Sequence, residues 1–425
     1  MSIARNNEYP SDWETKSIGD VFNVAERSIK MESDQSYRRV TVKRRHGGIE
    51  LRDVQLGADI KVKNQYLIKA GDFLISERQI VHGACGIVPL NLEDALVSNE
   101  YLVLEPSDNF DTRYFNYLVQ LPQYAKLFVL CSQGVDIEKF LFKPKDWLKK
   151  EIPSPPLAEQ QKIAAILTTL DDKLDVIKRQ IATTQTLKQG LMQSLFSRGV
   201  GTRDADGRWV HHSKFKESEL GKIPVEWNLD RLENISHSVT VGIATSTTEH
   251  YVEKGVPLIR NQNIKEDFLD GSDLLQVSLE FDNQNKTKRV KAGDILTVRT
   301  GYPGVSCVLP DGMGYVQTFT TLITRPNKDL INSHYLSRYF NSPKGKELML
   351  HQAAGGAQQN INAGNLKKLL IPVPTISEQL AIASILESVD MKIRILKTKQ
   401  ATYQTLKRGL MQKLLIGAWR VKVGK

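Results

Sequence analysis

The chain has 425 residues, of which 40% are hydrophobic and 25% charged, and its net charge at pH 7 is +10. This length exceeds what one hydrophobic core usually supports, so two to three domains of about 150 residues are expected. No apolar run approaches the roughly 20 residues that span a bilayer, and residues 1–13 lack the apolar core of a signal peptide, so we expect a cytoplasmic chain with no membrane partner.

The positive charge is unevenly distributed along the chain. Residues 1–150 hold 21 basic and 21 acidic side chains, and residues 217–370 hold 17 of each. The excess lies in residues 151–216, with 10 basic against 7 acidic side chains, and in residues 371–425, with 10 against 3. A basic chain favours an anionic partner such as nucleic acid, but the net charge alone does not indicate which surface meets that partner.

The first globular segment, residues 1–150, is expected to be α+β. Short runs rich in Val, Ile, Leu and Thr surround Ala70-Gly71-Asp72, with turn residues between them, and a helical stretch follows at residues 114–130. Positions 36 to 69 hold nine basic and three acidic side chains. The candidates there for contact with phosphates are Arg38, Arg39, Lys43, Arg44, Arg45, Lys61 and Lys63. The alternative is a solvated basic face.

Arg78, Gln79 and His82 follow the Ala-Gly-Asp element and are candidates for contacts with base edges. For His82, a nucleic-acid contact and a histidine satisfied within its own loop are equally open. The chain's three cysteines, Cys85, Cys131 and Cys307, form no CxxC pair and no cluster with zinc spacing. Neither a disulfide framework nor a metal site is therefore expected.

Residues 151–198 are expected to form a first long helix. Its apolar residues alternate in steps of four and three, which is the heptad period of a coiled coil. They are Ile163, Leu167, Leu170, Leu174, Ile177 and Ile181. Pro-x-Pro fixes an extended entry, and Glu159 in the first turn suits the positive end of the helix macrodipole.

Two weak catalytic matches occur beside this helix. Ser154-Pro155-Pro156-Leu157 is similar to the loop with which amino-group DNA methyltransferases hold a flipped base. Leu157 cannot stack like an aromatic ring and no glycine-rich cofactor loop accompanies it, so a helix entrance is favoured. The Asp-x-Lys spacings at Asp171 and Asp390 match half of a nuclease metal site, but exposed helix charges are favoured for both.

Residues 199–222 are polar and contain glycine, as expected of a linker, and its His211 and His212 are expected to be solvated. The second globular segment, residues 223–370, is again expected to be α+β, with strands around Gly293-Asp294 and a helix within residues 333–350. The candidates for phosphate contact are Lys286, Lys288 and Arg289, and those for base contact are Arg260, Asn261, Arg299 and Tyr302.

Residues 371–418 are expected to form a second long helix, followed by a basic tail at residues 419–425. Its heptad residues are Ile382, Leu386, Val389, Ile393 and Leu396, with Leu406, Leu410 and Leu414 extending the stripe. A single apolar stripe must be buried against something, and each helix has a near copy in the same chain. Parallel pairing would need both globular segments at one end, so an antiparallel pair that separates them is favoured.

The chain is a tandem duplication. Residues 152–196 match residues 371–415 without a gap, and 23 of these 45 positions are identical at an offset of 219. The globular segments share landmarks in the same order, since Trp13 corresponds to Trp227 and Cys85 corresponds to Cys307. We therefore expect an internal pseudo-twofold repeat in which the matched cysteines belong to the cores.

The order of these elements resembles the specificity subunit of type I restriction-modification systems over nearly the whole chain. The motifs that carry it are x-Pro-x-acid-Trp, Ala-Gly-Asp, Ile-Pro-x-Pro-x-x-x-Glu-Gln and Leu-Lys-x-Gly-Leu-Met-Gln, each occurring twice. The resemblance implies two target recognition domains that read the halves of a bipartite, asymmetric DNA target, with helices fixing the spacer. It also implies partners: two methyltransferase subunits that methylate adenine at N6 with S-adenosylmethionine, and restriction subunits that cleave DNA with ATP and Mg²⁺. No catalytic residue or cofactor is then expected in this chain.

Two other classes of function stay open at this point. A stand-alone DNA methyltransferase or nuclease would bind S-adenosylmethionine or cleave DNA by itself. A coiled-coil adaptor would bind proteins with its globular ends.

Overall fold

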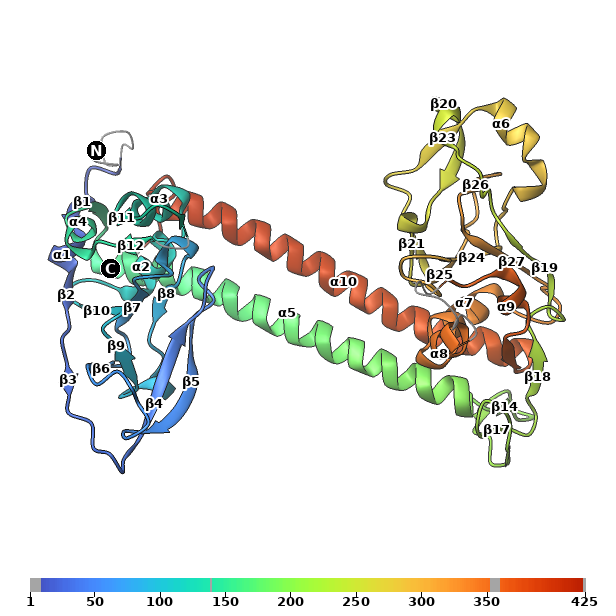
Figure 1. Cartoon of the computed structure of the whole chain (residues 1–425), viewed down its shortest axis with the longest axis horizontal. Coiled ribbons are helices and arrows are strands. Elements are labelled where there is room, and N and C mark those ends of the chain that lie inside the picture. Colours follow the sequence, from blue (N-terminus) through green and yellow to red (C-terminus); the bar gives the residue numbers. More distant parts are fainter. Residues whose placement is uncertain (1–8, 138–139, 352–359, 423–425) are drawn as a thin grey trace. The chain divides into compact units, whose positions relative to one another are not determined.

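The computed structural model describes residues 9–137, 140–351 and 360–422 (Figure 1). The chain forms two compact units, of which the first combines Met1–Lys178 with Thr398–Lys425 and the second is Arg179–Lys397. Each unit holds one globular domain and part of each long helix, α5 (Leu157–Arg198) and α10 (Ile376–Leu414). No helix among the described residues is both long and apolar enough to cross a membrane.

The first globular domain is α+β, as expected. Its strands are β1 (Glu14–Ser17), β2 (Phe22–Val24), β3 (Ser28–Ile29), β4 (Ser36–Val42), β5 (Ile49–Leu56), β6 (Gln65–Leu67), β7 (Phe73–Ser76), β8 (Cys85–Ile87), β9 (Leu96–Ser98), β10 (Tyr101–Pro106), β11 (Ser132–Gln133), β12 (Leu141–Phe142) and β13 (Glu151–Ser154). Its short helices are α1 (Ile18–Val21), α2 (Thr112–Leu118), α3 (Pro122–Leu130) and α4 (Pro144–Leu148), with 3-10 turns η2 (Ile80–His82) and η3 (Leu90–Leu92). The two larger sheets have the orders β2-β10-β7-β8 and β3-β6-β9-β4-β5.

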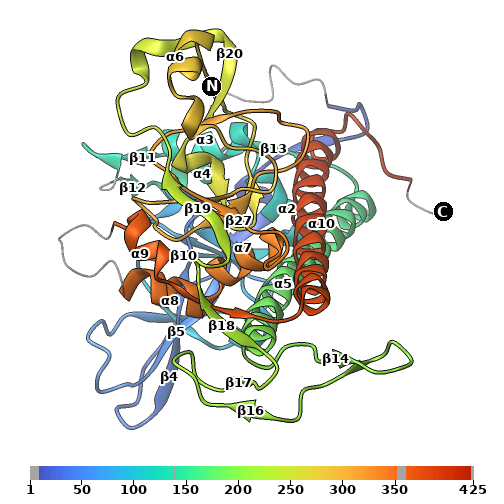
Figure 2. The same ribbon diagram turned by 90° about the vertical axis from the view of Figure 1, so that its right-hand side faces the viewer.

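The second globular domain is also α+β. Its strands are β18 (Asn228–Arg231), β19 (Ser236–Val241), β20 (Tyr251–Ile259), β21 (Ile264–Lys265), β22 (Phe268–Leu269), β23 (Leu275–Val277), β24 (Ile295–Thr297), β25 (Ser306–Val308), β26 (Gln317–Thr318), β27 (Leu322–Pro326) and β28 (Leu370–Val373). Its helices are α6 (Leu279–Gln284), α7 (Ser333–Asn341), α8 (Pro343–His351) and α9 (Ala363–Lys367), with 3-10 turns η5 (Thr248–His250), η6 (Asn261–Asn263) and η7 (Lys286–Lys288). Figure 2 shows α7 between the strands β19 and β27 and the long helix α10.

The two domains share one frame. The sheet β19-β27-β24-β25 repeats the order of β2-β10-β7-β8, and the Ala-Gly-Asp element precedes β7 in one domain and β24 in the other. The matched cysteines Cys85 and Cys307 lie in β8 and β25 and are fully buried, which confirms their expected place in the cores. Burial raises the pKa of the Cys307 thiol to about 12, so this thiol stays protonated and packs as a small apolar group.

The aspartate of each Ala-Gly-Asp element is a structural group. The buried Asp72 accepts from both terminal nitrogens of Arg27, at 2.6 and 3.1 Å, and from the backbone nitrogen of Lys69. The buried Asp294 is held in the same way by Arg325, at 2.9 and 2.7 Å, and by the backbone nitrogen of Lys291. Buried carboxylates need such partners, which explains why the motif occurs in both repeats.

Within each unit, α5 and α10 pack antiparallel. In the first unit, Glu159 at the start of α5 bonds Arg420 beyond the end of α10, and Asp171 further along α5 pairs with Lys407 at 2.5 Å. In the second unit, Lys188 near the end of α5 pairs with Asp390 near the start of α10 at 2.7 Å. The expected antiparallel pairing is therefore confirmed. Asp171 and Asp390 are partners across the helix pair. The interpretation as an exposed helix charge is wrong for Asp390, whose side chain is 13% exposed, whereas the Asp171 side chain is 38% exposed.

The heptad stripe faces inward along both helices. Buried positions are Ile163, Leu167, Leu170, Ile177, Ile181, Ile382, Leu386, Ile393 and Leu396, and partly buried ones are Leu174 and Val389. Leu414 is also buried and Leu410 packs on the same core, but Leu406 is 47% exposed. The expectation that Leu406 extends the stripe is wrong, because its place toward the other helix is taken by Lys407, which reaches Asp171.

Both helix entrances belong to the globular domains. β13 pairs with β1, and β28 pairs with β18, so residues 151–154 and 371–373 are sheet rather than helix. Ser154 is 5% exposed and lies opposite Glu14 in that pairing, which places it inside the β1-β13 ladder. The Ser-Pro-Pro-Leu stretch is thus the end of a strand followed by a helix start, where proline provides the extended backbone.

The linker is ordered against the second unit. It contains β14 (Thr202–Arg203), β15 (Trp209–Val210) and β16 (Phe215–Lys216), and β16 pairs with β17 (Ile223–Pro224). The His212 side chain is 1% exposed between Glu226 and Glu378, at 3.1 Å from each. The expectation that both histidines are solvated is therefore wrong for His212, because two carboxylates from outside the linker supply its partners, whereas His211 is exposed.

Candidate nucleic-acid interface

In the first domain, the β4–β5 turn docks on the loop that follows β7, residues 77–84. The backbone nitrogens of Arg45 and His46 donate to the carbonyls of His82 and Gly83 at 2.7 and 2.8 Å. Arg44 Nε donates to Gln79 Oε1 at 2.7 Å. Four sequence candidates, Arg44, Arg45, Gln79 and His82, are thereby brought together from two segments about 35 positions apart.

The shape of this turn explains the gathering. Arg45 and His46 have φ angles of 59° and 53°, in the left-handed region, and Gly48 follows with a φ of 88°. Such a run of positive φ angles turns the hairpin sharply, and the hydrogen bonds to loop 77–84 hold it there. The side chains of the exposed Arg44 and Arg45 therefore extend from the domain surface at a fixed place beside loop 77–84.

Apart from Arg78, which lies in loop 77–84 itself, the other cationic candidates of the first domain do not join this cluster. Arg39 forms a two-pronged pair with Asp53 at 2.7 and 2.8 Å, and its guanidinium holds the pKa of Asp53 below the usual value. The rest contact their own surroundings: Arg38 donates to the carbonyls of Asn91 and Glu93, Lys43 pairs with Glu50, Lys63 donates to the carbonyl of Gly57, Arg78 pairs with Glu100, and Lys61 is exposed. The cationic stretch between positions 36 and 69 is thus not one surface.

In the second domain, the equivalent loop follows β24 and spans residues 299–305. Asn261 Nδ2 donates to Thr300 Oγ1 at 3.2 Å, and the Tyr302 hydroxyl donates to the carbonyl of Asn261 at 2.7 Å. Arg260 reaches Asp273 at 3.1 Å. The candidates Arg260, Asn261, Arg299 and Tyr302 therefore meet at the same place of the frame as their counterparts in the first domain.

This second cluster has unused hydrogen-bonding capacity. Arg260 Nε, Asn261 Oδ1 and Arg299 Nε are buried polar atoms that find no hydrogen-bond partner among the described residues. Buried polar groups are normally paired, and an unpaired one costs about 1–3 kcal/mol. These three atoms are buried, so they add no exposed donor or acceptor to the loop surface.

The remaining cations of the second domain have structural contacts. Arg289 binds the buried Asp282 and lies over the ring of Tyr315 at 5.5 Å, and it holds the pKa of Asp282 below the usual value. Lys288 donates to the carbonyl of Val241 at 3.0 Å. Of the three phosphate candidates in this stretch, the exposed Lys286 alone has neither an ion pair nor a side-chain hydrogen bond within the described part of the chain.

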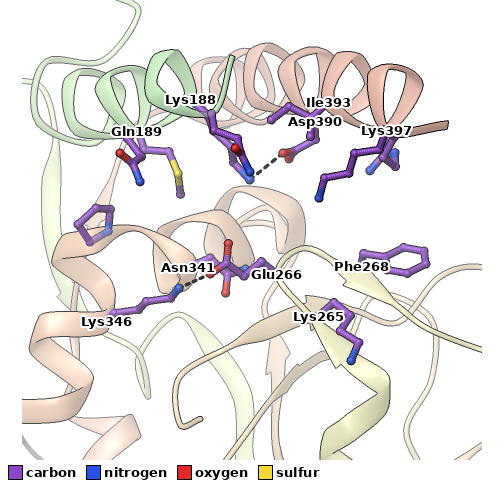
Figure 3. Close-up of a pocket in the computed structure, with 14 residues that line it drawn as sticks. Lys188, Gln189, Lys265, Glu266, Phe268, Asn341, Lys346, Asp390, Ile393 and Lys397 are labelled. Carbon is purple, nitrogen blue, oxygen red and sulfur yellow. Dashed lines mark hydrogen bonds and ion pairs between the residues drawn. The ribbon is translucent and has the colours of Figure 1, made fainter. Parts of the chain in front are cut away.

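A cleft of about 550 Å³ lies in the second unit between the long helices and the domain (Figure 3). Met192, Phe268 and Ile393 provide apolar lining. Lys265 and Lys397 line it too and make no ion pair with another described residue, unlike the paired Lys188 and Lys346. The cleft therefore offers two unpaired cations. Among the described residues, no group of three His, Cys, Asp or Glu side chains could hold a metal ion.

The sequence did not indicate how each domain is attached to the helices. Glu159 accepts from Trp13 Nε1 at 3.1 Å, and Glu378 accepts from Trp227 Nε1 at 2.9 Å. All four residues are landmarks of the repeat, and their joint duplication was a signal that they contact one another. No such signal pointed to Tyr117 of α2 or Arg338 of α7, because the two repeats hold different residue types at this pair of corresponding positions.

The fold and these loops define a protein with two different clusters of polar side chains on one repeated frame. The family described as "Type I restriction modification DNA specificity domain" matches residues 10–185 and 224–403. The chain belongs to this family, and its relatives are named specificity subunits of type I restriction enzymes.

Three comparisons illustrate the likeness. The chain is 24% identical to the type I restriction enzyme MjaVIII specificity subunit of Methanocaldococcus jannaschii, over 97% of this chain and 94% of that one. Its fold is similar to the type I restriction-modification system S subunit from M. genitalium, with a TM-score of 0.56, 14% identity, and coverage of 97% of this chain and 98% of that one. A chain from the solved structure of a type I system gives a TM-score of 0.55 at 17% identity, over 97% of this chain and 100% of that one.

Proposed function

We propose that this chain is the specificity subunit of a type I restriction-modification complex, in which each globular domain reads one half of a bipartite, asymmetric DNA target. The observation that carries the proposal is the pair of equivalent loops, 77–84 and 299–305, which hold different polar side chains on the same frame. A repeated frame with different loops suits two different half-sites, since base readout depends on a few side chains at fixed places.

The antiparallel helices supply the spacer between the half-sites. Each is a continuous helix of 42 or 39 residues, so at about 1.5 Å per residue it spans roughly 60 Å, and within each unit its heptad stripe is buried. The number of base pairs between the half-sites then follows from helix length.

The chemistry belongs to partner subunits, and this chain is the non-catalytic member. The proposed partners are DNA, two methyltransferase subunits that use S-adenosylmethionine, and restriction subunits that use ATP and Mg²⁺, all in the cytoplasm. Exposed apolar residues on the long helices support two equivalent docking surfaces. Val176 and Leu406 lie in the first unit, and Ile395 and Leu187 are their counterparts in the second, each 43–58% exposed. Apolar side chains on an outer helix face are typical of a surface that a partner helix covers.

The test is base-resolution mapping of N6-methyladenine in cells with and without the gene. One bipartite motif should lose its methylation when the gene is absent, and restoring the chain should return it. An unchanged methylome in cells that express the methyltransferase and restriction subunits would contradict the proposal. S-adenosylmethionine binding or DNA cleavage by the purified chain alone would favour the enzyme class instead.

Substitutions in loop 77–84 and beside loop 299–305 assign each half-site to a domain. Gln79→Ala should relax the sequence preference in one half of the motif and Asn261→Ala in the other, each by about 1–3 kcal/mol of discrimination at one base pair. Matched controls are Lys30→Ala and Lys254→Ala, which remove exposed cations outside the loops in the same domains. If either loop variant altered both halves together, the assignment of one domain to one half-site would be wrong.

A further inference from the structure

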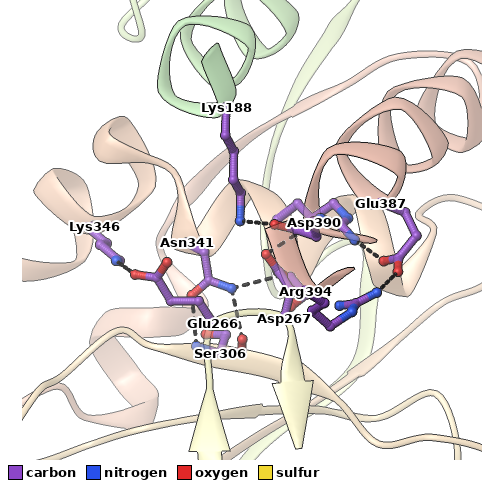
Figure 4. Close-up of polar contacts among 11 residues, drawn as sticks. Lys188, Glu266, Asp267, Ser306, Asn341, Lys346, Glu387, Asp390 and Arg394 are labelled. Carbon is purple, nitrogen blue, oxygen red and sulfur yellow. Dashed lines mark hydrogen bonds and ion pairs between the residues drawn. The ribbon is translucent and has the colours of Figure 1, made fainter. Parts of the chain in front are cut away.

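In the second unit, the recognition domain is attached to the long helices through a buried arginine. Arg338, on α7, is 2% exposed and donates to Asp390 of α10 at 2.6 Å and to Glu387. Asp390 also pairs with Lys188 of α5 at 2.7 Å, so one carboxylate joins the domain to both helices (Figure 4). This contact fixes the domain relative to the two helix segments of its own unit.

In the first unit, an uncharged side chain makes the equivalent contact. The Tyr117 hydroxyl, on α2, donates to Asp171 of α5 at 2.7 Å. Lys407 of α10 pairs with the same carboxylate at 2.5 Å and lies 5.2 Å from the centre of the Tyr117 ring. Here too, one aspartate joins the domain to both helices.

Tyr117 and Arg338 occupy the same position of the repeat. Each lies six residues after the residue that caps its helix, Asp111 for α2 and Asn332 for α7. Their partners correspond as well, because Asp171 and Asp390, and likewise Lys188 and Lys407, are separated by the repeat offset of 219. The aspartate and the lysine of the contact are therefore the same in both repeats, while the domain side has changed from a neutral to a cationic group. The second helix partner differs as well, because the Tyr117 hydroxyl lies 3.2 Å from Thr168 Oγ1, whereas Arg338 donates to Glu387 at the equivalent position.

A second residue on the domain side has changed with it. The tip of the β21–β22 hairpin places Asp267, with a φ of 57°, at 3.7 Å from Arg338, and the Asp267 nitrogen donates to the carbonyl of Ser306 (Figure 4). The tip of the β4–β5 hairpin places His46, with a φ of 53°, against β8, with its Nδ1 at 3.5 Å from Cys85 Sγ. Burial and the nearby Lys407 ammonium lower the pKa of His46, which keeps its imidazole neutral.

Charge balance explains why these residues change together. An arginine added at the position of Tyr117 brings one extra buried charge, and the aspartate at the hairpin tip compensates it. The first unit uses two neutral groups, Tyr117 and His46, and the second uses a cation and an anion, Arg338 and Asp267. Either combination leaves the aspartate–lysine pair between the helices balanced, and in the second unit Glu387, which also contacts Arg338, is paired with Arg394 at 2.5 Å.

The hairpin tips also adjoin candidates that contact the reading loops 77–84 and 299–305. Arg44 and Arg45 immediately precede His46, and Asn261 is joined to Asp267 through η6 and β21. A shift of the tip on the helices therefore moves the base-reading candidates relative to the spacer.

We propose that Tyr117 and Arg338 are positioning residues that set where each reading loop lies on the spacer helices, and that Tyr117 with His46 and Arg338 with Asp267 are interchangeable pairs. This inference rests on the proposed function for its DNA readout. It predicts that breaking one pair widens the range of accepted spacers, whereas exchanging the whole pair restores the native spacer.

The experiment compares Arg338→Tyr, Asp267→His and the double variant in the assembled methyltransferase complex. Methylation is measured on DNA targets with the native spacer and with one base pair more or fewer. Each single variant should lower kcat/KM on the native spacer by about 100-fold, as displacements near 1 Å commonly do, and should raise the relative use of the altered spacers. The double variant should recover most of the native rate and preference. Lys344→Ala, on the neighbouring α8 surface, is the matched control.

The outcomes separate the inference from the proposed function. If the wild-type complex methylates no bipartite target, the proposed function fails, and urea unfolding of the same four chains still tests whether the two substitutions are coupled. If the wild type is active but the single variants lose rate with an unchanged spacer preference, the residues are structural only. If the double variant is no better than the singles, the reciprocal exchange Tyr117→Arg with His46→Asp is examined. Failure of both exchanges would overturn interchangeability.

Discussion

The carboxylate of Glu378 offers the sharpest test of how the linker is held. Glu378 is 1% exposed and lies in the first turn of α10. Its Oε1 accepts from the backbone nitrogens of Val200 and Gly201 at 2.8 and 2.9 Å, and its Oε2 accepts from Trp227 Nε1 at 2.9 Å. The perturbation is Glu378→Gln, which keeps the shape but replaces one oxygen with a donor amide.

The expected loss follows from these contacts. Whichever way the new amide turns, its nitrogen faces at least one N–H group, so at least one buried hydrogen bond to a charged group is lost and one donor is left unpaired. A hydrogen bond to a charged group contributes about 1.5–3 kcal/mol, and the orphaned donor adds about 1–3 kcal/mol. We expect Glu378→Gln to lower the free energy of unfolding of the second unit by about 3–5 kcal/mol.

The repeat supplies a matched comparison. Glu159 accepts from Trp13 and from Arg420, whose side chain is 42% exposed. Water can replace much of that ion pair, so Glu159→Gln should cost about 1–2 kcal/mol less than Glu378→Gln. Urea unfolding followed by tryptophan fluorescence measures both, with the exposed Glu217→Gln as a control. Equal losses, or a loss under about 1 kcal/mol for Glu378→Gln, would refute the reasoning.

Three further predictions concern the spacer, the partners and pH. Removing residues 175–181 and 397–403 together keeps both interhelical ion pairs and shortens each helix by about 10 Å, so methylome mapping should find a shorter spacer between unchanged half-sites; an unaltered spacer would mean that the helices are not the ruler. Val176→Glu with Leu406→Glu should reduce the methyltransferase subunits that co-purify with the chain from two to one, measured by mass photometry, while Lys399→Glu should not. Burial raises the pKa of Asp267, so the folded chain binds its proton at a higher pH than the unfolded chain does, and stability gained from this group appears as pH falls toward about 4. The stability of the wild type relative to Asp267→Asn should therefore rise as pH is lowered from 7, and a difference independent of pH in denaturant titrations would contradict this.

The sequence predicted the buried face of the long helices more completely than the contacts of the polar side chains around the loops. The heptad residues of α5 and α10 are buried because a period of 3.5 in one continuous segment is enough to define a face. The candidates Gln79 and Asn261 were found from their residue types, and Gln79 also from its place after the Ala-Gly-Asp landmark. Which neighbouring cations are free for DNA was not predictable, since Arg39, Arg78 and Arg289 are neutralised by acids on other elements.

The sequence by itself determined the duplication, the α+β character of both domains and the two long helices, because each depends on local periodicity or on comparison of one segment with its copy. Only the tertiary structure decided the roles of His212, Arg338 and Asp171. Asp171 and Lys407 are 236 positions apart, and no local pattern links them. The physical reason is that the free energy of a buried charge depends on partners supplied by distant segments, and their distance and burial exist only after the chain has folded.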